Sequence, residues 1–230
     1  MAVIDRAIHH GLDWLLPRRC VLCSRLGTGL CGPCAERLAP PIGGRPPPGI
    51  DRVVALCAYE GAGRSLVLGL KRGGRRDAVG DLGAALAEGL QCALTAGGAV
   101  GGAVGGPAGG PLSLVRDLTP TITWAPTTDR RRRSRGFDQA ELLARAVARS
   151  GGWSCARLLS RHSPPQAGLD LAHRRHGPRF EPRGAAPPLV VLVDDVVTSG
   201  ATMSAAADAL HHGGARHVVA AVIARAERHG

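Results

Sequence analysis

The run Leu189–Val193 constrains the fold more than any other feature of this sequence. LVVLV is apolar throughout and rich in β-branched residues, as expected of a strand buried on both faces of a parallel sheet. Two acids and a turn of small residues follow this run. The next segment, SAAADALHH, is a predicted helix that ends at glycines 213 and 214, and RHVVAAVIA is a second predicted strand. Strand, helix and strand within about 35 residues form a βαβ unit. The sequence therefore predicts an α/β fold with a mostly parallel sheet flanked by helices.

Upstream of this unit, the periodicity predicts two further strands and three further helices. The strands are RVVALCAY, which starts at Arg52, and TITWAP, which ends at Pro126. The helices are one with SLVLGLK after a glycine turn at 61–63, one over 81–94, and GFDQAELLARAVARSG. We expect residues 51–230 to form this α/β domain, with a flexible glycine-rich insertion at 97–111. Residues 1–50 are expected to form an N-terminal module, comprising a short helix, a cysteine-rich segment and the turn-rich linker PPIGGRPPPG.

The cysteine-rich segment has the spacing of a zinc site. Cys20, Cys23, Cys31 and Cys34 form two Cys-x-x-Cys pairs with seven residues between them. Two thiolate pairs complete a tetrahedral site for Zn²⁺ and leave no position open for substrate, so a zinc ion held there would be structural. A thiol-redox function is the alternative, although one reactive pair would suffice for it. Disulfides are a poorer interpretation, because the chain has an odd number of cysteines, seven, and no recognisable export signal.

Composition and charge limit the function classes only weakly. The formal net charge is +11, which favours polyanionic partners, yet Lys71 is the only lysine among 29 cationic side chains. Such an arginine excess is typical of nucleotide bias in the coding DNA as much as of a basic surface. No apolar run reaches the roughly 18 residues of a membrane span. The first twenty residues lack a cationic head and an apolar core, so we expect no secretory signal and a cytoplasmic location.

The segment that follows the apolar run carries the strongest chemical signal. Asp194 and Asp195 would stand at the carboxyl end of a strand, where open α/β sheets bind ligands. Adjacent carboxylates hold two vicinal hydroxyls or a divalent cation. Next come five residues at the start of a helix, whose amides and hydroxyls suit a phosphate: Thr198, Ser199, Gly200, Ala201 and Thr202. A phosphate beside a diol is a ribose 5-phosphate. The alternative is an ordinary strand-to-helix turn with acids near the helix start.

This stretch, VVLVDDVVTSGAT, closely resembles the phosphoribosyl-pyrophosphate (PRPP) binding motif of type I phosphoribosyltransferases. The resemblance implies a type I phosphoribosyltransferase-like fold and binding of PRPP together with Mg²⁺. It also implies that Asp194 and Asp195 are catalytic residues that orient the ribose diol, and that 198–202 hold the 5-phosphate.

A second anionic subsite is expected for the pyrophosphate. The segment APTTDRRRRSRGFDQ places five arginines just before a predicted helix, and arginine suits forked contacts with phosphate oxygens. For most of this run, a solvated basic loop is the better interpretation. We favour Arg135 and Gly136 for the subsite, because they stand nearest the helix start.

Three further segments extend the resemblance to the ComF family of competence-associated phosphoribosyltransferase-like proteins. They are RSRGFDQ, LKRGGR around Lys71, and SPPQAGLDLAHRRH over 163–176, which in related transferases forms a hood over PRPP. Together with the cysteine module, the likeness covers 15–225 apart from the glycine-rich insertion. It adds Lys71 to the candidate pyrophosphate residues.

The resemblance implies transfer of a phosphoribosyl group to a nitrogen acceptor with release of pyrophosphate. The acceptor is not readable from the sequence. Departures from the family pattern at Arg72, Asp138, Ser163 and His176 keep an alternative open, a non-catalytic PRPP-binding factor that acts in DNA uptake, competence or recombination. Under that alternative, DNA or the DNA-uptake machinery would be the partner.

Overall fold

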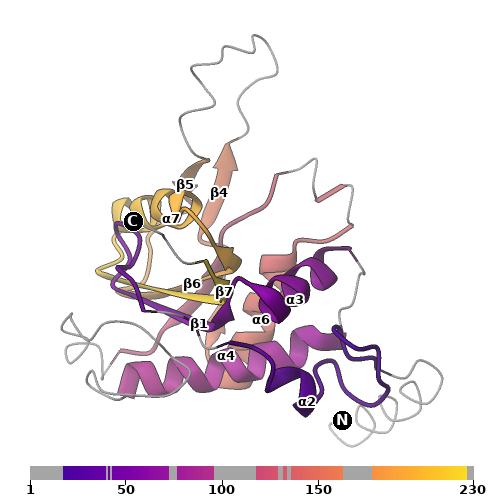
Figure 1. Ribbon diagram of the computed structural model, residues 1–230. Helices are drawn as coiled ribbons and strands as arrows, with labels where there is room; N and C mark the ends of the chain where they lie inside the picture. The colour runs from indigo at the N-terminus through magenta and orange to yellow at the C-terminus, as the bar shows by residue number, and fades with distance from the viewer. Residues whose placement is uncertain are drawn as a thin grey trace, which may run out of the picture.

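The computed structural model describes residues 18–39, 41, 43–72, 77–95, 118–128, 132–133, 136–162 and 178–226. Within them, a five-stranded sheet in the order β1-β7-β6-β2-β3 forms the centre of the molecule, and every neighbouring pair is parallel (Figure 1). Its strands are β1 (Arg52–Ala58), β2 (Thr121–Trp124), β3 (Ser154–Cys155), β6 (Leu189–Val197) and β7 (His217–Arg225). The α/β class with a parallel sheet is therefore confirmed.

Five described helices and a hairpin accompany the sheet. The helices are α2 (Gly32–Ala35), α3 (Gly61–Arg72), α4 (Asp77–Thr95), α6 (Gln139–Gly151) and α7 (Ala201–His212). The hairpin pairs β4 (Leu159–His162) with β5 (Arg179–Pro182) in antiparallel fashion and projects away from the sheet in Figure 1. None of the helices in the described ranges is both long and apolar enough to cross a membrane.

The two faces of the sheet carry separate hydrophobic cores. Along β6, Val191 and Val193 face the core beneath α3, α4 and α6, whereas Val190 and Leu192 face the core beneath α7. All four side chains are fully buried, which explains why the sequence shows no polar alternation here. Figure 1 shows α4 and α6 together on one side of the sheet and α7 on the other.

Local signals in the sequence fix the helix that follows β2. Asp138 is the N-cap of α6, and its Oδ1 accepts a hydrogen bond from the Ala140 amide at 3.1 Å. Gly152 ends the helix in the left-handed conformation, at φ 68°. The element therefore begins and ends close to where its composition predicts.

Three boundaries differ from the sequence-based expectation. Strand β6 continues through both acids to Val197, because Asp194 and Val196 still pair with β7. Helix α3 begins at Gly61, within the expected turn, and α4 begins at Asp77. The predicted N-terminal helix, the glycine-rich insertion and the hood segment 163–176 lie outside the described residues.

Candidate functional site

A cavity of about 300 Å³ opens at the carboxyl end of β6, and we call it the acidic cavity. Among the residues that line it are five that the sequence singled out: Lys71, Asp194, Asp195, Thr198 and Thr202. These residues come from the end of α3, the end of β6 and the start of α7. The fold thus brings together side chains that stand up to 131 positions apart in the chain, 71 to 202.

The two carboxylates have different surroundings. Asp195 forms an ion pair with Lys71, whose Nζ lies 2.8 Å from Asp195 Oδ2. Asp194 Oδ1 accepts a hydrogen bond from the Asp195 amide at 2.8 Å. Burial, and after it the negative charge of Asp195, raise the pKa of Asp194 to about 8, against the smaller lowering effects of the Asp195 amide and of Lys71. In the free protein near neutral pH, the raised pKa of Asp194 favours its protonated form.

The turn after β6 places backbone amides at the start of α7. Gly200 is the N-cap of α7 and has φ 76°, a left-handed conformation that a side chain would strain. Gly200 has no side chain that could cap the helix, the Ala201 amide donates to Ser199 Oγ at 3.4 Å, and the first turn of α7 holds no acidic residue. Thr198, Ser199 and Ala201 are exposed, and Gly200 is buried. The turn has the positive N-terminal end and the accessible hydroxyls that an anion requires.

The residues expected to bind pyrophosphate are only partly described. Lys71 lines the acidic cavity, as stated above, while Arg135 lies outside the described residues. Gly136 is exposed with φ 74°, and it leads directly into Phe137, which lines the cavity. Arg132 and Arg133, from the same basic run, are exposed.

Three of the residues that line the acidic cavity but were not predicted as site residues carry charged or amide side chains: Asp138, Gln139 and Arg161. Besides capping α6, Asp138 accepts a hydrogen bond from the Thr127 amide at 2.9 Å, so it joins the segment after β2 to the start of α6 at the cavity wall. Gln139 is 8% exposed, and its buried Oε1 has no hydrogen-bond partner among the described residues. The motif GFDQ contains both residues and was the available signal for them.

The sequence contains no motif that would have identified Arg161 as a site residue, because Arg161 lies in a short strand with no recognisable pattern around it. Its Nη1 donates to the Pro126 carbonyl at 3.2 Å, and its guanidinium lies 5.5 Å from the centre of the Phe180 ring. These contacts hold a cation at the cavity beside the two acids, where an anionic ligand would meet it.

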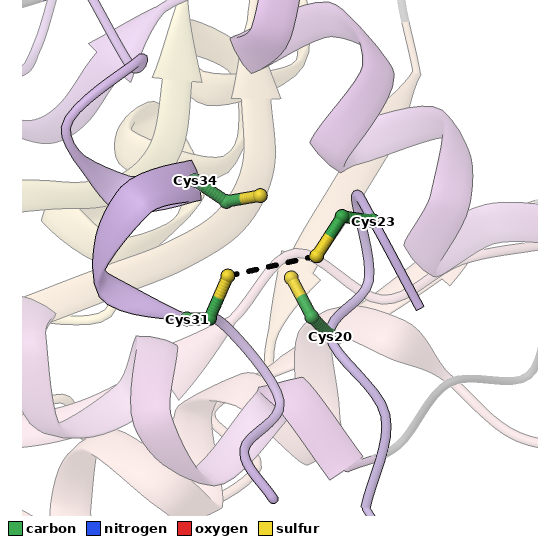
Figure 2. Close-up of side chains that lie close together, drawn as sticks. All are labelled: Cys20, Cys23, Cys31 and Cys34. Carbon is green, nitrogen blue, oxygen red and sulfur yellow. Dashed lines mark hydrogen bonds between the residues drawn. The ribbon is translucent and has the colours of Figure 1, made fainter. Parts of the chain in front are cut away.

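The four cysteines of the N-terminal module converge on one point, as Figure 2 shows. Their Sγ atoms all lie within 4.8 Å of one another, and Cys23 Sγ is 3.6 Å from Cys31 Sγ. Cys20, Cys31 and Cys34 are buried, whereas Cys23 is exposed. The donor set and its convergence fit a tetrahedral Zn²⁺ ion, so these four residues could hold a zinc ion.

Two of the four thiols have pKa values that are shifted in opposite directions when no metal is bound. Burial acts to raise the pKa of Cys20, but backbone hydrogen bonds, the largest from Cys31, lower it to about 6. The side-chain hydrogen bond with Cys31, followed by burial, raises the pKa of Cys34 to about 12. Metal binding must therefore displace protons from this cluster, and the affinity for metal falls as the solution is acidified.

The cysteine module is docked on the helices beside the acidic cavity. Asp81 of α4 accepts hydrogen bonds from the Thr28 hydroxyl at 2.9 Å and from the Gly29 amide at 3.0 Å. Val21 lies so close to Gly69 of α3 that a Cβ at position 69 would be 2.9 Å from a Val21 methyl group. Because Lys71 follows on the same helix, the module supports the helix that delivers Lys71 to the cavity.

The arrangement can bind a polyanion that also carries hydroxyl groups. The turn at 198–202 offers amides and hydroxyls, Lys71 and Arg161 offer positive charge, and the two aspartates offer hydroxyl acceptors. No protein-family model matches this chain, and a search of curated proteins finds no match either.

Proposed function

We propose that this protein binds PRPP at the acidic cavity and transfers its phosphoribosyl group to a nitrogen acceptor. The observation that supports this most directly is the shared lining of one cavity by Asp194, Asp195, Thr198 and Thr202. The proposal includes a type I phosphoribosyltransferase-like fold and membership of the ComF family, both of which rest on the sequence resemblance described above.

The 5-phosphate would lie in the turn between β6 and α7. The left-handed Gly200 lets the chain turn sharply, so that amides at the start of α7 and the hydroxyls of Thr198 and Thr202 converge on one anion. The first turn of α7 holds no acidic residue, so the positive end of the helix would meet the negative charge of the phosphate.

The ribose hydroxyls would be bound by the two aspartates. Ionised carboxylates accept hydrogen bonds only, and vicinal hydroxyls supply two donors at a suitable separation. Asp195 is positioned by its ion pair with Lys71, and Asp194 must release its proton to act as an acceptor through both oxygens.

In the reaction, the acceptor nitrogen forms a bond to C1 of the ribose while the bond from C1 to the pyrophosphate oxygen breaks. The electron pair leaves with pyrophosphate, and the proton lost by the nitrogen passes to solvent. Lys71 and Arg161 would stabilise the negative charge that develops on the leaving group.

Two metal ions belong to the proposal. Zn²⁺ at the four cysteines would be structural, because four thiolates complete its shell. The carboxylate oxygens of Asp194 and Asp195 also suit Mg²⁺, which prefers oxygen ligands. When bound with PRPP, Mg²⁺ supplies charge neutralisation for the pyrophosphate.

Calorimetric titration with Mg²⁺-PRPP tests the proposal. The wild-type protein should bind, and Asp195→Asn should bind at least about tenfold more weakly, since a charge-assisted hydrogen bond is lost. Asp208→Asn is the matched control, because Asp208 is exposed on α7 and does not line the cavity. No heat of binding at millimolar ligand would contradict the proposal. Binding without pyrophosphate release across a panel of acceptors would instead favour the non-catalytic alternative.

A further inference from the structure

The last turn of α3 contacts the cysteine module and the acidic cavity at the same time. Lys71, in this turn, lines the cavity and forms the ion pair with Asp195. Gly69, two residues earlier, meets the module, because a Cβ there would lie 2.9 Å from a Val21 methyl group and 3.3 Å from the Val21 carbonyl oxygen. Residues two apart in a helix are separated by about 200° around its axis, so these two contacts lie on nearly opposite sides of α3.

The contact between Gly69 and Val21 is a packed one. A glycine inside a helix costs about 1 kcal/mol relative to alanine, and here the close approach of Val21 accounts for the missing side chain. Val21 is buried and belongs to the same hydrophobic core as Leu66 and Leu70 of α3, both of which are fully buried. A displacement of Val21 would therefore displace the last turn of α3 with it.

Val21 is also part of the candidate zinc site. It stands within the first Cys-x-x-Cys turn, and its amide donates to the Gly29 carbonyl at 2.8 Å, in the segment between the two cysteine pairs. Leu22 and Leu30 pack against both the cysteine cluster and the hydrophobic core that contains Val21. The four thiols point toward one another in Figure 2, so a metal ion would join the two pairs and fix Val21 relative to α3.

We infer that zinc binding at the four cysteines is coupled to ligand binding at the acidic cavity, and that Val21 and Gly69 are positioning residues that transmit this coupling to Lys71. The inference rests on the proposed function, which supplies the ligand. With zinc bound, the last turn of α3 presents Lys71 to the cavity; without zinc, the cysteine turn keeps its hydrogen bonds but loses the constraint of the metal. Such coupling is reciprocal, so Mg²⁺-PRPP must raise the affinity for zinc by the same factor.

Calorimetric titration with Mg²⁺-PRPP on the full chain, zinc-loaded and zinc-stripped, tests the coupling. The chelator is dialysed away before Mg²⁺ is added. The zinc-stripped protein should bind at least about fivefold more weakly. Competition with a chromogenic zinc chelator should show that zinc is held more tightly by the same factor when Mg²⁺-PRPP is present, with a protein-free sample to correct for zinc bound by PRPP.

Two variants test the contact while zinc is bound. Gly69→Ala leaves the four cysteines intact, so it should keep its zinc, and it should weaken Mg²⁺-PRPP binding about fivefold by pushing α3 away from the module. Adding Val21→Ala removes the nearest methyl group and should restore most of the affinity. Gly80→Ala, at an open position on α4, is the matched control and should bind as the wild type does.

A double-mutant cycle separates positioning of Lys71 from a general effect on the fold. In Lys71→Met there is no ammonium group to position, so Gly69→Ala should cause no further loss of Mg²⁺-PRPP affinity. A merely structural role of Gly69 would produce the same fold loss in Lys71→Met as in the wild type.

The outcomes separate the inference from the proposed function. If Mg²⁺-PRPP binds but zinc removal or Gly69→Ala leaves its affinity unchanged, or if the losses from Gly69→Ala and Lys71→Met are additive, the inference is wrong while the proposed function stands. Should the zinc-stripped protein unfold, the zinc-loaded variants decide by the same criteria. Failure of Mg²⁺-PRPP itself to bind would overturn the proposed function and the inference with it.

Discussion

The proton on Asp194 should make the affinity for Mg²⁺-PRPP depend strongly on pH. Burial and the neighbouring Asp195 raise the pKa of Asp194 to about 8, whereas the ribose hydroxyls require its ionised form. With that pKa, about 1% of the side chain is ionised near pH 6 and about half near pH 8. The dissociation constant should therefore fall about 50-fold between these two pH values, which corresponds to roughly 2 kcal/mol of binding free energy.

Calorimetric titration in several buffers measures this effect directly. Buffers that differ in their enthalpy of ionisation should reveal release of nearly one proton per PRPP bound near neutral pH. The ligand's own phosphate titrates near pH 6 and contributes equally to wild type and variant. Asp194→Asn removes the protein's contribution, so its residual pH dependence is that of the ligand. An equal pH dependence in wild type and Asp194→Asn, or binding without proton release, would refute the reasoning.

The same group also affects the stability of the ligand-free protein. The pKa of Asp194 lies near 8 in the folded state and near 3.8 in the unfolded state. Between these values the folded protein binds a proton that the unfolded chain has released, so the free energy of unfolding falls as pH rises across this window. Urea denaturation of wild type and Asp194→Asn at several pH values should show a steeper fall for the wild type; parallel curves would contradict this.

Three further predictions concern the neighbouring features. Lys71→Met removes the ion pair with Asp195 and should weaken Mg²⁺-PRPP binding at least about tenfold by calorimetry, with the fold retained by circular dichroism; unchanged affinity would exclude a binding role. Metal analysis should find one zinc per chain, lost in Cys31→Ser with a lowered melting temperature, and retained in Cys92→Ser, whose side chain is exposed; zinc retained in Cys31→Ser would contradict the site. Gly83→Ala should lower the free energy of unfolding in urea by about 1–3 kcal/mol, because its Cβ would lie 2.5 Å from the Ala146 methyl group. Gly80→Ala has open space around its Cβ and should leave the free energy of unfolding unchanged or raise it. Similar effects of both substitutions would refute the close packing of α4 on α6.

Much of the fold was predictable because its signals are local. The buried run of β6, the aspartate cap of α6 and the glycines after α6 and α7 each act within a few residues of themselves. The end of β6 was less clear, since Asp194 interrupts the apolar pattern while its backbone still pairs with Val222 of β7. Pairing between strands overrides side-chain polarity at the carboxyl end of this central strand, and the sequence alone does not reveal it.

The site was predictable where a motif carries it and not where distant segments meet. Asp194, Asp195 and the following turn share one contiguous motif. The ion pair of Lys71 with Asp195 joins residues far apart in the chain, and no local pattern in the sequence predicts it. Arg161 reaches the cavity only because of the way the β4–β5 hairpin is placed, which no local pattern encodes.

A crystal structure with ribose 5-phosphate and Mg²⁺ would test the central claim most directly. The account predicts phosphate density against the amides that begin α7, with the 2- and 3-hydroxyls of the ribose in hydrogen-bond contact with Asp194 and Asp195. Density for the phosphate at any other place, or a sugar turned away from both carboxylates, would contradict it.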